Sequence, residues 1–396
     1  MEIIKLIKIQ KTGAVQYFKI AIIFLLRAIK KIFYIFPICE NRIIFISQRG
    51  TQYSCNPKYL FEYIYKKYGN KYQYIWCLND KKLLPKEFIN TKRIEYLSIK
   101  YIWYTLTSKY YISNVFIEPI IPGRKGQVVI NTWHGGGAYK RIDIFASVYS
   151  SIRQYGLFIG KIRAEQTSYY IASCKKFEVC LSKDFNASEK KFLPIGMPRN
   201  DILFSTHSFK EKIKNYYNID QALSIVLYAP TFRGIGHNPE AFNFTIKIDE
   251  LIKYLEIKFF KKFILLYRGH HYFINNCIPS EIINASDYPD MQELLCAADV
   301  LITDYSSSMW DFSLMYKPCF IYAPDVKKYQ AEQGFYTPVE KWPFPFAETN
   351  EELMEKIFHF DEGKYRQTVK KHHEDLGSYE TGKSCEQFCR IIFGPD

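Results

Sequence analysis

The sequence predicts two α/β domains, each built on a doubly wound parallel sheet. Short apolar runs, such as those at 43–46 and 300–302, are typical of strands that are buried on both faces. These runs alternate with stretches long enough for a helix, which is the order that parallel sheets require. The pattern stops at 192–203, a segment with two prolines and a glycine, and then begins again. A chain of 396 residues is long enough for two such domains.

The predicted domains occupy residues 39–205 and 206–396. The first has strands expected at 43–46, 72–78, 94–99, 110–112 and 128–133, followed by a mostly helical region up to residue 190. The second has strands expected at 224–230, 263–269, 300–306 and 318–324, and then a helical tail from 351 to 393 with breaks at Gly363 and Gly377. We therefore expect two Rossmann-like domains that face each other across a cleft.

Residues 1–38 form a separate segment. Seven lysines and arginines oppose a single acid, Glu2, and apolar residues recur between them at spacings of three and four. This pattern predicts a basic amphipathic helix that lies in the headgroup region of an anionic membrane. The alternative is a first helix that packs on the protein's own core with its lysines in solvent. The apolar run at 20–26 is too short to span a membrane, and no signal-peptide cleavage site follows it.

The composition narrows the possible partners. A net charge of +14 favours acidic surfaces or ligands, such as anionic lipid, nucleic acid or phosphorylated substrates. The positive charge is concentrated in the first 31 residues and no nucleic-acid recognition motif is present, so we expect no nucleic-acid partner. The ten cysteines form no CxxC pair, which argues against a zinc site and fits a reducing, cytoplasmic setting.

Four polar loops follow predicted strands, at 133–141, 229–234, 267–273 and 303–308. The carboxyl ends of parallel strands lie at one edge of a sheet, so we expect these loops to line a common cleft. In the last loop, TDYSSS, serine hydroxyls can cap the helix that begins near Met309. The free N–H groups and the dipole of that helix start favour a phosphate, so we expect a diphosphate there. An ordinary βα turn with a serine cap is the alternative interpretation.

The loop WHGGGAYKR contains the candidate general base. Three glycines follow His134 and let a ligand approach closely. A histidine is suited to this role because its pKa can lie near the operating pH. Lys140 and Arg141 lie one turn further on, where they can meet an anion. A histidine that only caps the loop is the alternative; the lipase function that HGGG also marks is excluded, since the chain has no GxSxG nucleophile elbow.

The two remaining loops contain cationic candidates. Arg233 follows a predicted strand and is expected to clamp a phosphate through two parallel hydrogen bonds. Arg268 and His270 follow another strand. Adjacent side chains on a strand point to opposite faces, so only one of His270 and His271 is expected to enter the cleft, and we prefer His270. Adjacent histidines without a further carboxylate make a poor metal pair, and no metal site is expected.

The segment GSYETGKS at 377–384 satisfies the P-loop pattern letter for letter. Its context is wrong for a nucleotide site, because a charged helical stretch precedes it and only twelve residues follow it. We interpret it as a break between two helices.

Several motifs together resemble the CDP-glycerol glycerophosphotransferases, the polyol-phosphate transferases of teichoic acid and related capsule synthesis. These motifs are WHG…K at 133–140, GMPRND at 196–201, YAPTFR at 228–233, YRGHHY at 267–272, and the block at 299–325 that contains LITDYSS, DF and KP. The early S-x-R-G…NPKYL stretch at 47–60 also fits. The resemblance implies a GT-B fold, in which the active site lies between two Rossmann-like domains, preceded by a membrane-associating helical segment.

The resemblance also implies a reaction: an acceptor hydroxyl attacks the β-phosphorus of CDP-glycerol, CMP leaves and a phosphodiester forms. His134 would be the base on the acceptor hydroxyl, and His270 would contact the donor phosphates and stabilise charge as CMP departs. The substrate-binding residues would be Gly135, Lys140, Thr231, Arg233, Arg268, Asp304, Ser306 and Ser307. Positive charges at the phosphates reduce the need for a metal, so no obligatory metal or other cofactor is expected.

This chain departs from the family in the loop after the histidine, which reads WHGGGAYKR where the family more often has a WHGTPLK-like sequence. The departure leaves open whether the acceptor is a lipid-linked polyol phosphate or a glycan, and ribitol phosphate can replace glycerol phosphate. The expected location is the cytoplasmic face of the membrane, with peripheral attachment through residues 1–38. The alternative function is a GT-B glycosyltransferase that uses a sugar nucleotide for surface polysaccharide.

Overall fold

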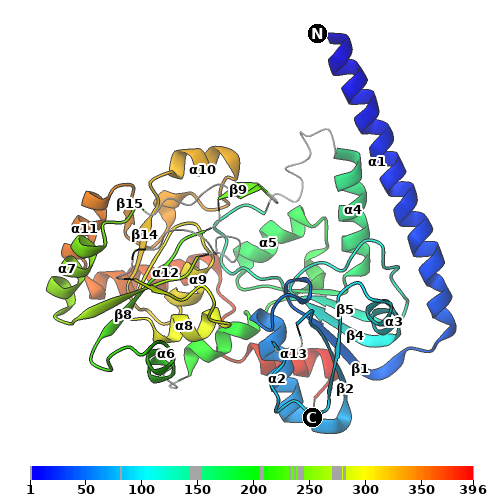
Figure 1. The fold of residues 1–396 in the computed structure, drawn as a ribbon, viewed down its shortest axis with the longest axis horizontal. Helices are drawn as coiled ribbons and strands as arrows, with labels where there is room; N and C mark the ends of the chain where they lie inside the picture. The colour runs from blue at the N-terminus through cyan, green and yellow to red at the C-terminus, as the bar shows by residue number, and fades with distance from the viewer. Residues whose placement is uncertain are drawn as a thin grey trace. The chain divides into compact units, whose positions relative to one another are not determined.

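A computed structural model shows two compact units, each built around one parallel sheet (Figure 1). It describes residues 2–80, 83–142, 153–205, 209–231, 233–235, 238–239, 245–269, 279 and 282–395. Unit 1 comprises Met1–His134, Ile142–Arg199 and Lys383–Asp396, and unit 2 comprises Gly135–Arg141 and Asn200–Gly382. Gly135–Arg141 therefore belongs to unit 2, although the residues on both sides of it belong to unit 1.

The sheet of unit 1 has seven strands in the order β3-β2-β1-β4-β5-β6-β7, all paired in parallel. The order reverses at β1, as in a doubly wound sheet, and confirms the predicted architecture. Residues 43–46 at the end of β1 are all buried, as their apolar sequence predicted. The strands are β1 Cys39–Ile46, β2 Gln73–Cys77, β3 Thr91–Ile94, β4 Ser108–Ser113, β5 Val128–Asn131, β6 Tyr169–Ile171 and β7 Phe192–Leu193.

The helices of unit 1 pack on this sheet and on each other. Helices α2 (Cys55–Tyr68) and α3 (Ile99–Thr107) contact both β1 and β4. Helix α5 (Lys175–Asp184) has Cys174 as its N-cap, which follows β6. The last helix, α13 (Ser384–Phe393), packs on α2.

The first helix, α1 (Glu2–Lys30), is followed by the short helix η1 (Lys31–Ile35) and packs on α4 (Arg153–Gln166) (Figure 1). Ile23 is buried against two isoleucines of α4. Helix α1 also exposes large apolar side chains, namely Tyr17, Phe18, Phe24, Leu25 and Ile29, although the ring of Phe24 lies 5.1 Å from that of Phe158 in α4. None of the helices in the described part of the chain combines the length and the apolar character that crossing a membrane requires.

Two of the basic side chains of α1 point into the protein, which the sequence did not predict. The guanidinium of Arg27 donates to the carbonyls of Pro119 and Ile121 at 2.8 and 2.9 Å. Lys30 is buried, whereas Lys19 and Lys31 are exposed. Lys5, Lys8 and Lys11 lie where the helix is described but the side chains are not.

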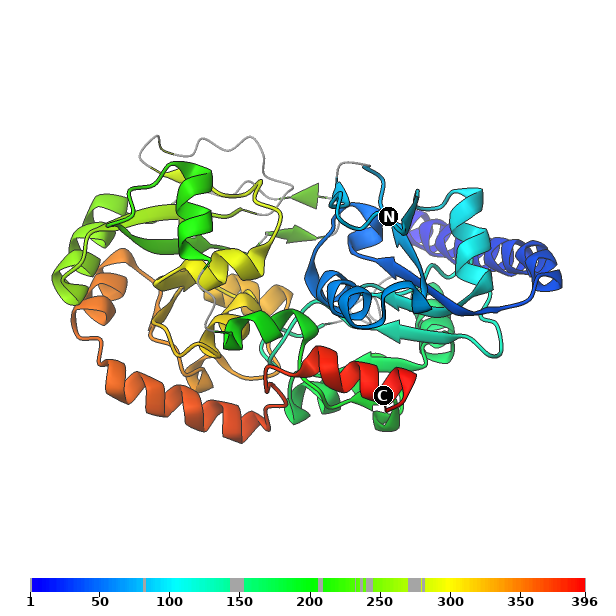
Figure 2. The same ribbon diagram turned by 90° about the horizontal axis from the view of Figure 1, so that it is seen from below.

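The sheet of unit 2 has six strands in the order β12-β11-β8-β13-β14-β15, again all parallel. They are β8 Ser224–Ala229, β11 Phe263–Tyr267, β12 Ile283–Asn284, β13 Val300–Thr303, β14 Cys319–Tyr322 and β15 Phe346–Ala347; the short pair β9 Gly234–Ile235 and β10 Asn238–Pro239 is antiparallel. The helices are α6 Lys210–Tyr217, α7 Ile248–Phe259, α8 Met291–Ala297, α9 Ser308–Ser313, α10 Val326–Glu332, α11 Asn350–Phe358 and α12 Glu362–Leu376. Helices α7 and α11 lie side by side (Figure 2).

The structure corrects three predictions of local structure. The strand expected at 94–99 lies at 91–94, because an edge strand with Thr91, Lys92 and Arg93 carries no apolar run. The short strand β6 falls in the region expected to be mostly helical. Gly363 does not break a helix, since α12 begins at Glu362. Gly377 does end α12, in a left-handed conformation with φ of 65°.

The units also differ from the predicted domain limits. The chain leaves unit 1 between Arg199 and Asn200, six residues before the expected boundary at 205/206, and α13 belongs to unit 1 rather than to the second domain. The P-loop-like segment contains the αL cap Gly377 and the first residue of α13, Ser384, whose hydroxyl donates to the carbonyl of Ile195 at 2.7 Å. This segment is a helix connection, as the context indicated.

Candidate active site

Asp304, at the carboxyl end of β13, is the centre of a buried polar network in unit 2. It is 1% exposed. Its Oδ1 accepts hydrogen bonds from the backbone N–H and the hydroxyl of Thr231, at 2.8 and 2.5 Å, and from the N–H of Tyr305 at 2.5 Å. Its Oδ2 lies 2.8 Å from Nη2 of Arg233. Because β8 and β13 are neighbours, the loops that follow them meet at Asp304, as the sequence predicted.

Arg233 is held by acceptors within its own unit. Nε and Nη2 donate to the two oxygens of Asp325 at 2.6 and 3.0 Å, and Nη1 donates to the carbonyl of Thr231 at 2.7 Å. The rings of Tyr305 and Tyr329 lie 4.9 and 5.3 Å from its Cζ. Burial lowers the pKa of Arg233, but the nearby carboxylates raise it by more. The predicted phosphate clamp would have to break these bonds, so in this structure Arg233 orders the loop.

Lys140 is placed beside the Asp304 network by segment 135–141. Its pKa is lowered by burial, raised in part by the charge of Asp304 and lowered further by that of Arg233, which puts the ammonium within electrostatic range of both. Within the described residues no hydrogen bond of this ammonium is found. Among the described residues of this network, Lys140 is therefore the cation that no acceptor holds, and it can meet an anion.

Segment 135–141 pairs with residues 333–337 of unit 2. Lys140 forms an antiparallel bridge with Phe335, and the carbonyls of Ala138 and Tyr139 accept hydrogen bonds from Thr337 and Tyr336 at 2.6 and 2.7 Å. The N–H of Arg141 donates to the carbonyl of Gly334 at 3.1 Å. These bonds fix the position of Lys140 in unit 2.

Gly136 and Gly137 are required by close packing on Trp310 and Tyr139. A Cβ added at Gly136 would lie 2.4 Å from Cδ1 of Trp310, and one at Gly137 would lie 2.5 Å from the ring of Tyr139. Gly137 also has a φ of +64°. The hydroxyl of Tyr139 lies 3.0 Å from Nε2 of His372, whose pKa burial lowers to about 4. Packing thus explains the departure from the family pattern that the sequence showed at these glycines.

The start of α9 is built as predicted. Ser307 is the N-cap, and α9 begins at Ser308. The hydroxyl of Ser306 accepts hydrogen bonds from the N–H and the hydroxyl of Ser308, at 3.2 and 3.0 Å. The side chain of Ser307 makes no capping hydrogen bond, and it is half-buried. Its hydroxyl can therefore turn toward a ligand at the carboxyl edge of the sheet.

The loop after β11 is only partly described. The guanidinium of Arg268 donates to the carbonyls of Ala285 and Tyr288, at 3.2 and 2.7 Å, so it holds a neighbouring turn in place. Burial lowers the pKa of Arg268. His270, the second candidate catalytic residue, lies outside the described residues, as does His271.

In unit 1, His134 follows β5 at the carboxyl edge of the sheet. Its side chain is exposed, and its Nδ1 lies 3.0 Å from the carbonyl oxygen of Asn114. A carbonyl can only accept, so Nδ1 carries the proton, and in the neutral ring the lone pair is therefore on Nε2. The ring stacks on Trp133 with centroids 4.5 Å apart. This is the tautomer that a general base requires.

Sequence reasoning gave no role to a second buried network in unit 2. Asn200 donates to Asp311 and to Glu380 at 3.0 Å each, and Gln292 donates to Asn200 and Asp311 at 3.1 Å each. The indole N–H of Trp310 donates to Glu380 at 3.0 Å. Asn200 belongs to the GMPRND motif and Asp311 to the DF motif. Their hydrogen bonds therefore hold α9, the helix that follows the serine turn, in place.

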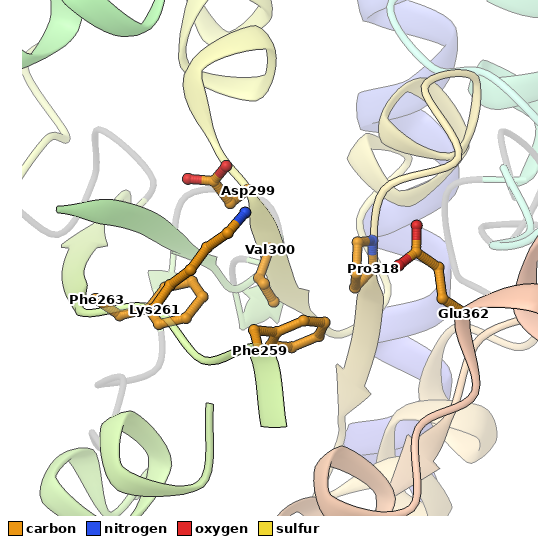
Figure 3. Close-up of a pocket in the computed structure, with 7 residues that line it drawn as sticks. All are labelled: Phe259, Lys261, Phe263, Asp299, Val300, Pro318 and Glu362. Atoms are coloured by element: carbon orange, nitrogen blue, oxygen red, sulfur yellow. The ribbon is translucent and has the colours of Figure 1, made fainter. Parts of the chain in front are cut away.

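A small hollow of about 130 Å³ lies at the amino ends of the unit 2 strands, away from the loops that follow β8 and β13 (Figure 3). It is lined by residues that precede or begin strands, including Lys261, Phe263 and Asp299. Ligands of parallel sheets bind beyond the carboxyl ends of the strands, and this hollow is at the amino ends. Asp299 is already bonded to Lys210 and to the N–H of Ile225, at 2.6 and 2.8 Å. It is not the candidate active site.

Curated relatives and solved structures match this chain to proteins of teichoic acid synthesis, and a family model matches it as well. The chain is 29% identical over 372 residues to a teichoic acid poly(glycerol phosphate) polymerase of Bacillus spizizenii, covering 90% of this chain and 93% of that one. It is 27% identical to a teichoic acid glycerol-phosphate transferase of Staphylococcus aureus, covering 89% and 93%. It spans about half the length of two further poly(glycerol phosphate) polymerases.

The fold matches that of the wall teichoic acid polymerase TagF, with a TM-score of 0.80, 24% sequence identity, and coverage of 98% of this chain and 97% of that one. This likeness confirms the GT-B type of fold. The family model described as CDP-Glycerol:Poly(glycerophosphate) glycerophosphotransferase matches residues 28–394, nearly the whole chain. The chain therefore belongs to the CDP-glycerol:poly(glycerophosphate) glycerophosphotransferase family.

Proposed function

We propose that the chain transfers glycerol phosphate, or a related polyol phosphate, from CDP-glycerol to a hydroxyl group of a teichoic acid or capsular acceptor, and releases CMP. Family membership supplies the substrate class. The observation that carries the mechanism is the geometry of His134, whose Nδ1 donates to a carbonyl, so that in the neutral ring the basic lone pair is on Nε2.

In the proposed reaction, Nε2 of His134 accepts the proton of the acceptor hydroxyl, and the oxygen attacks the β-phosphorus of the donor. The bond from that phosphorus to the bridging oxygen of CMP breaks, CMP leaves with the electron pair, and a phosphodiester forms. Lys140 and the start of α9 at Ser306 and Ser307 provide positive potential for the diphosphate. Asp304 joins the loop after β8 to the loop that leads into α9, and the pairing with Phe335 holds Lys140.

His270 remains the proposed partner of the departing CMP, on the strength of the YRGHHY motif alone. We also propose that no metal or other cofactor is obligatory, since Lys140 and the start of α9 supply positive potential for the phosphates. Adding a chelator to the assay tests this: transfer should persist at an unchanged rate.

The donor is tested by incubating the protein with CDP-glycerol, CDP-ribitol, and UDP- and CMP-sugars, and measuring the nucleotide released in the presence of acceptor. We expect CMP release from a CDP-polyol and none from the sugar nucleotides. Release from sugar donors alone would replace the proposal with a sugar-nucleotide-dependent glycosyltransferase, which the same phosphate cradle would also serve.

We further propose that the protein lies on an anionic membrane at its cytoplasmic face, attached through α1, where a lipid-linked acceptor would be presented. The exposed apolar side chains of α1 support this, together with Lys19 and Lys31. Phe18→Ser with Leu25→Ser should release the protein from anionic vesicles in a sedimentation assay. Phe358→Ser, at an exposed apolar position of unit 2, is the matched control and should leave binding unchanged.

A further inference from the structure

Three consecutive backbone carbonyls around His134 are each bound by a buried side chain. Nδ2 of Asn56 donates to the carbonyls of Thr132 and Trp133, at 3.1 and 3.0 Å, and more weakly to Sδ of Met197 at 3.6 Å. Nη1 of Arg199 donates to the carbonyl of His134 at 2.7 Å. Thus every peptide carbonyl from Thr132 to His134 is held by a donor from a distant part of unit 1.

The two donor side chains are also joined to each other. Oδ1 of Asn56 accepts a hydrogen bond from the backbone N–H of Arg199 at 3.1 Å. Asn56 is fully buried and Arg199 is 6% exposed, so water does not compete for these bonds. Asn56 lies in the first turn of α2 and Arg199 lies just before the chain enters unit 2. The hydrogen bond between them joins the start of α2, residues 132–134 and the segment before unit 2 next to His134.

The backbone at this point needs support. Trp133 has a φ of +53°, a conformation that a large side chain adopts only where the surrounding structure holds it. The turn at Trp133 places the ring of His134 so that Nδ1 reaches the carbonyl of Asn114. If the carbonyls of residues 132–134 lost their donors, the backbone could relax and the imidazole would lose that bond.

We propose that Asn56 and Arg199 are positioning residues for His134, acting as a carbonyl clamp that fixes its tautomer and its place at the sheet edge. This inference rests on the proposed function, in which His134 is the base. Both residues belong to unit 1, whereas every predicted donor-binding residue belongs to unit 2. The clamp should therefore govern turnover without governing donor affinity.

The chain offers a matched control for each clamp residue. Nε2 of Gln127 donates to the carbonyls of Thr105 and Ser108 at 2.7 Å each, so it also bridges two carbonyls, but it precedes β5 at the other edge of the sheet. The guanidinium of Arg124 donates to the carbonyls of Leu106, Tyr34 and Phe36, also away from His134. Gln127→Ala and Arg124→Met thus remove the same kinds of bond without touching the base.

The test measures kcat for CMP release, KM and Kd for CDP-glycerol, and Tm for each variant. Asn56→Ala and Arg199→Met should lower kcat about 100-fold with KM and Kd within about twofold of wild type. Arg199→Lys, which retains a donor, should recover about tenfold of that loss. The control variants should lose comparable Tm but keep kcat within about threefold. Equal losses of kcat in clamp and control variants, or a loss of donor affinity, would overturn the proposal.

A second readout separates this inference from the proposed function. The ¹⁵N resonances of labelled His134 report its tautomer without any substrate. Wild type should show protonated Nδ1, and Arg199→Met should show a mixture of tautomers. If wild type releases no CMP from CDP-glycerol, the proposed function fails, and the ¹⁵N spectra still decide the clamp: unchanged spectra in Arg199→Met would refute it.

Discussion

The substitution Asp304→Ala tests how much the network at the end of β13 contributes to unit 2. Asp304 accepts three hydrogen bonds on Oδ1 and faces Arg233 on Oδ2, and it is 1% exposed. Breaking a buried ion pair by removing one partner costs about 3–5 kcal/mol, because the other charge stays buried. Arg233 keeps the carboxylate of Asp325, which offsets part of that cost, while the N–H groups of Thr231 and Tyr305 lose their acceptor. We expect a loss of about 4 kcal/mol, a large share of a typical domain stability of about 5–15 kcal/mol.

Asp304→Asn should cost less, about 2 kcal/mol: its carbonyl can still accept the three Oδ1 bonds, while the charge opposite Arg233 is lost and the amide NH2 faces the donor Nη2 of Arg233. The assay is native-state hydrogen exchange of peptides from β8 and β13, which reports the opening free energy of unit 2 separately from that of unit 1. Asp287→Ala is the control, because that carboxylate is exposed and, among the described residues, accepts a hydrogen bond from the hydroxyl of Tyr217 alone. If the alanine variant at 304 stayed within about 1 kcal/mol of wild type, the reasoning would be refuted.

Three further predictions concern unit 2. Burial lowers the pKa of His372 and His373 to about 4. Between pH 6.5 and pH 4 the unfolded chain therefore binds protons at these histidines, while the folded chain does not. The free energy of unfolding, measured with urea, should be constant above pH 6.5 and fall by roughly 3 kcal/mol per histidine down to pH 4. Replacing both by phenylalanine should flatten this dependence, and an unchanged slope would contradict the assignment. Gly136→Ala should lower the free energy of unfolding by about 1–3 kcal/mol through its clash with Trp310, and the same change in a Trp310→Leu background should cost less, which a double-mutant cycle measures. Ser307→Ala should weaken CDP-glycerol binding by up to about tenfold in calorimetry with no change in Tm, and equal affinity would remove its proposed role.

The strands that build the site could be predicted because they are buried on both faces. The apolar runs of β1, β8, β11, β13 and β14 were located to within one to four residues of their observed bounds. The loops after β8 and β13 meet where the parallel order required. Strand β3 was expected at 94–99 and lies at 91–94, because an edge strand with one solvent face needs no apolar run.

The pairing of side chains far apart in the chain could not be predicted from local patterns. Arg233 bonds to Asp325, 92 residues away, and nothing in the letters around either residue indicates that pair. Likewise, Asn56 and Arg199 stood inside the motifs NPKYL and GMPRND without a role, because only the fold brings them to the carbonyls beside His134. That segment 135–141 belongs to unit 2 could not be predicted either, because its backbone partners lie near residue 335.

The pKa values at the site show why residue type alone is a weak guide to role. Arg233 and Lys140 both looked like phosphate ligands in the sequence. In the structure two carboxylates hold Arg233 and raise its pKa, whereas burial lowers the pKa of Lys140 and the described residues give its ammonium no hydrogen bond. The difference is one of partners, which composition does not reveal.

The central claim is that His134 is the general base of polyol-phosphate transfer. The most direct measurement compares wild type with His134→Ala for CMP release from CDP-glycerol in the presence of acceptor, together with the Kd of CDP-glycerol for each. We predict that release falls by at least about 100-fold, within the range typical of a lost general base, while the Kd stays within about twofold. Turnover by the alanine variant at the wild-type rate would contradict the claim.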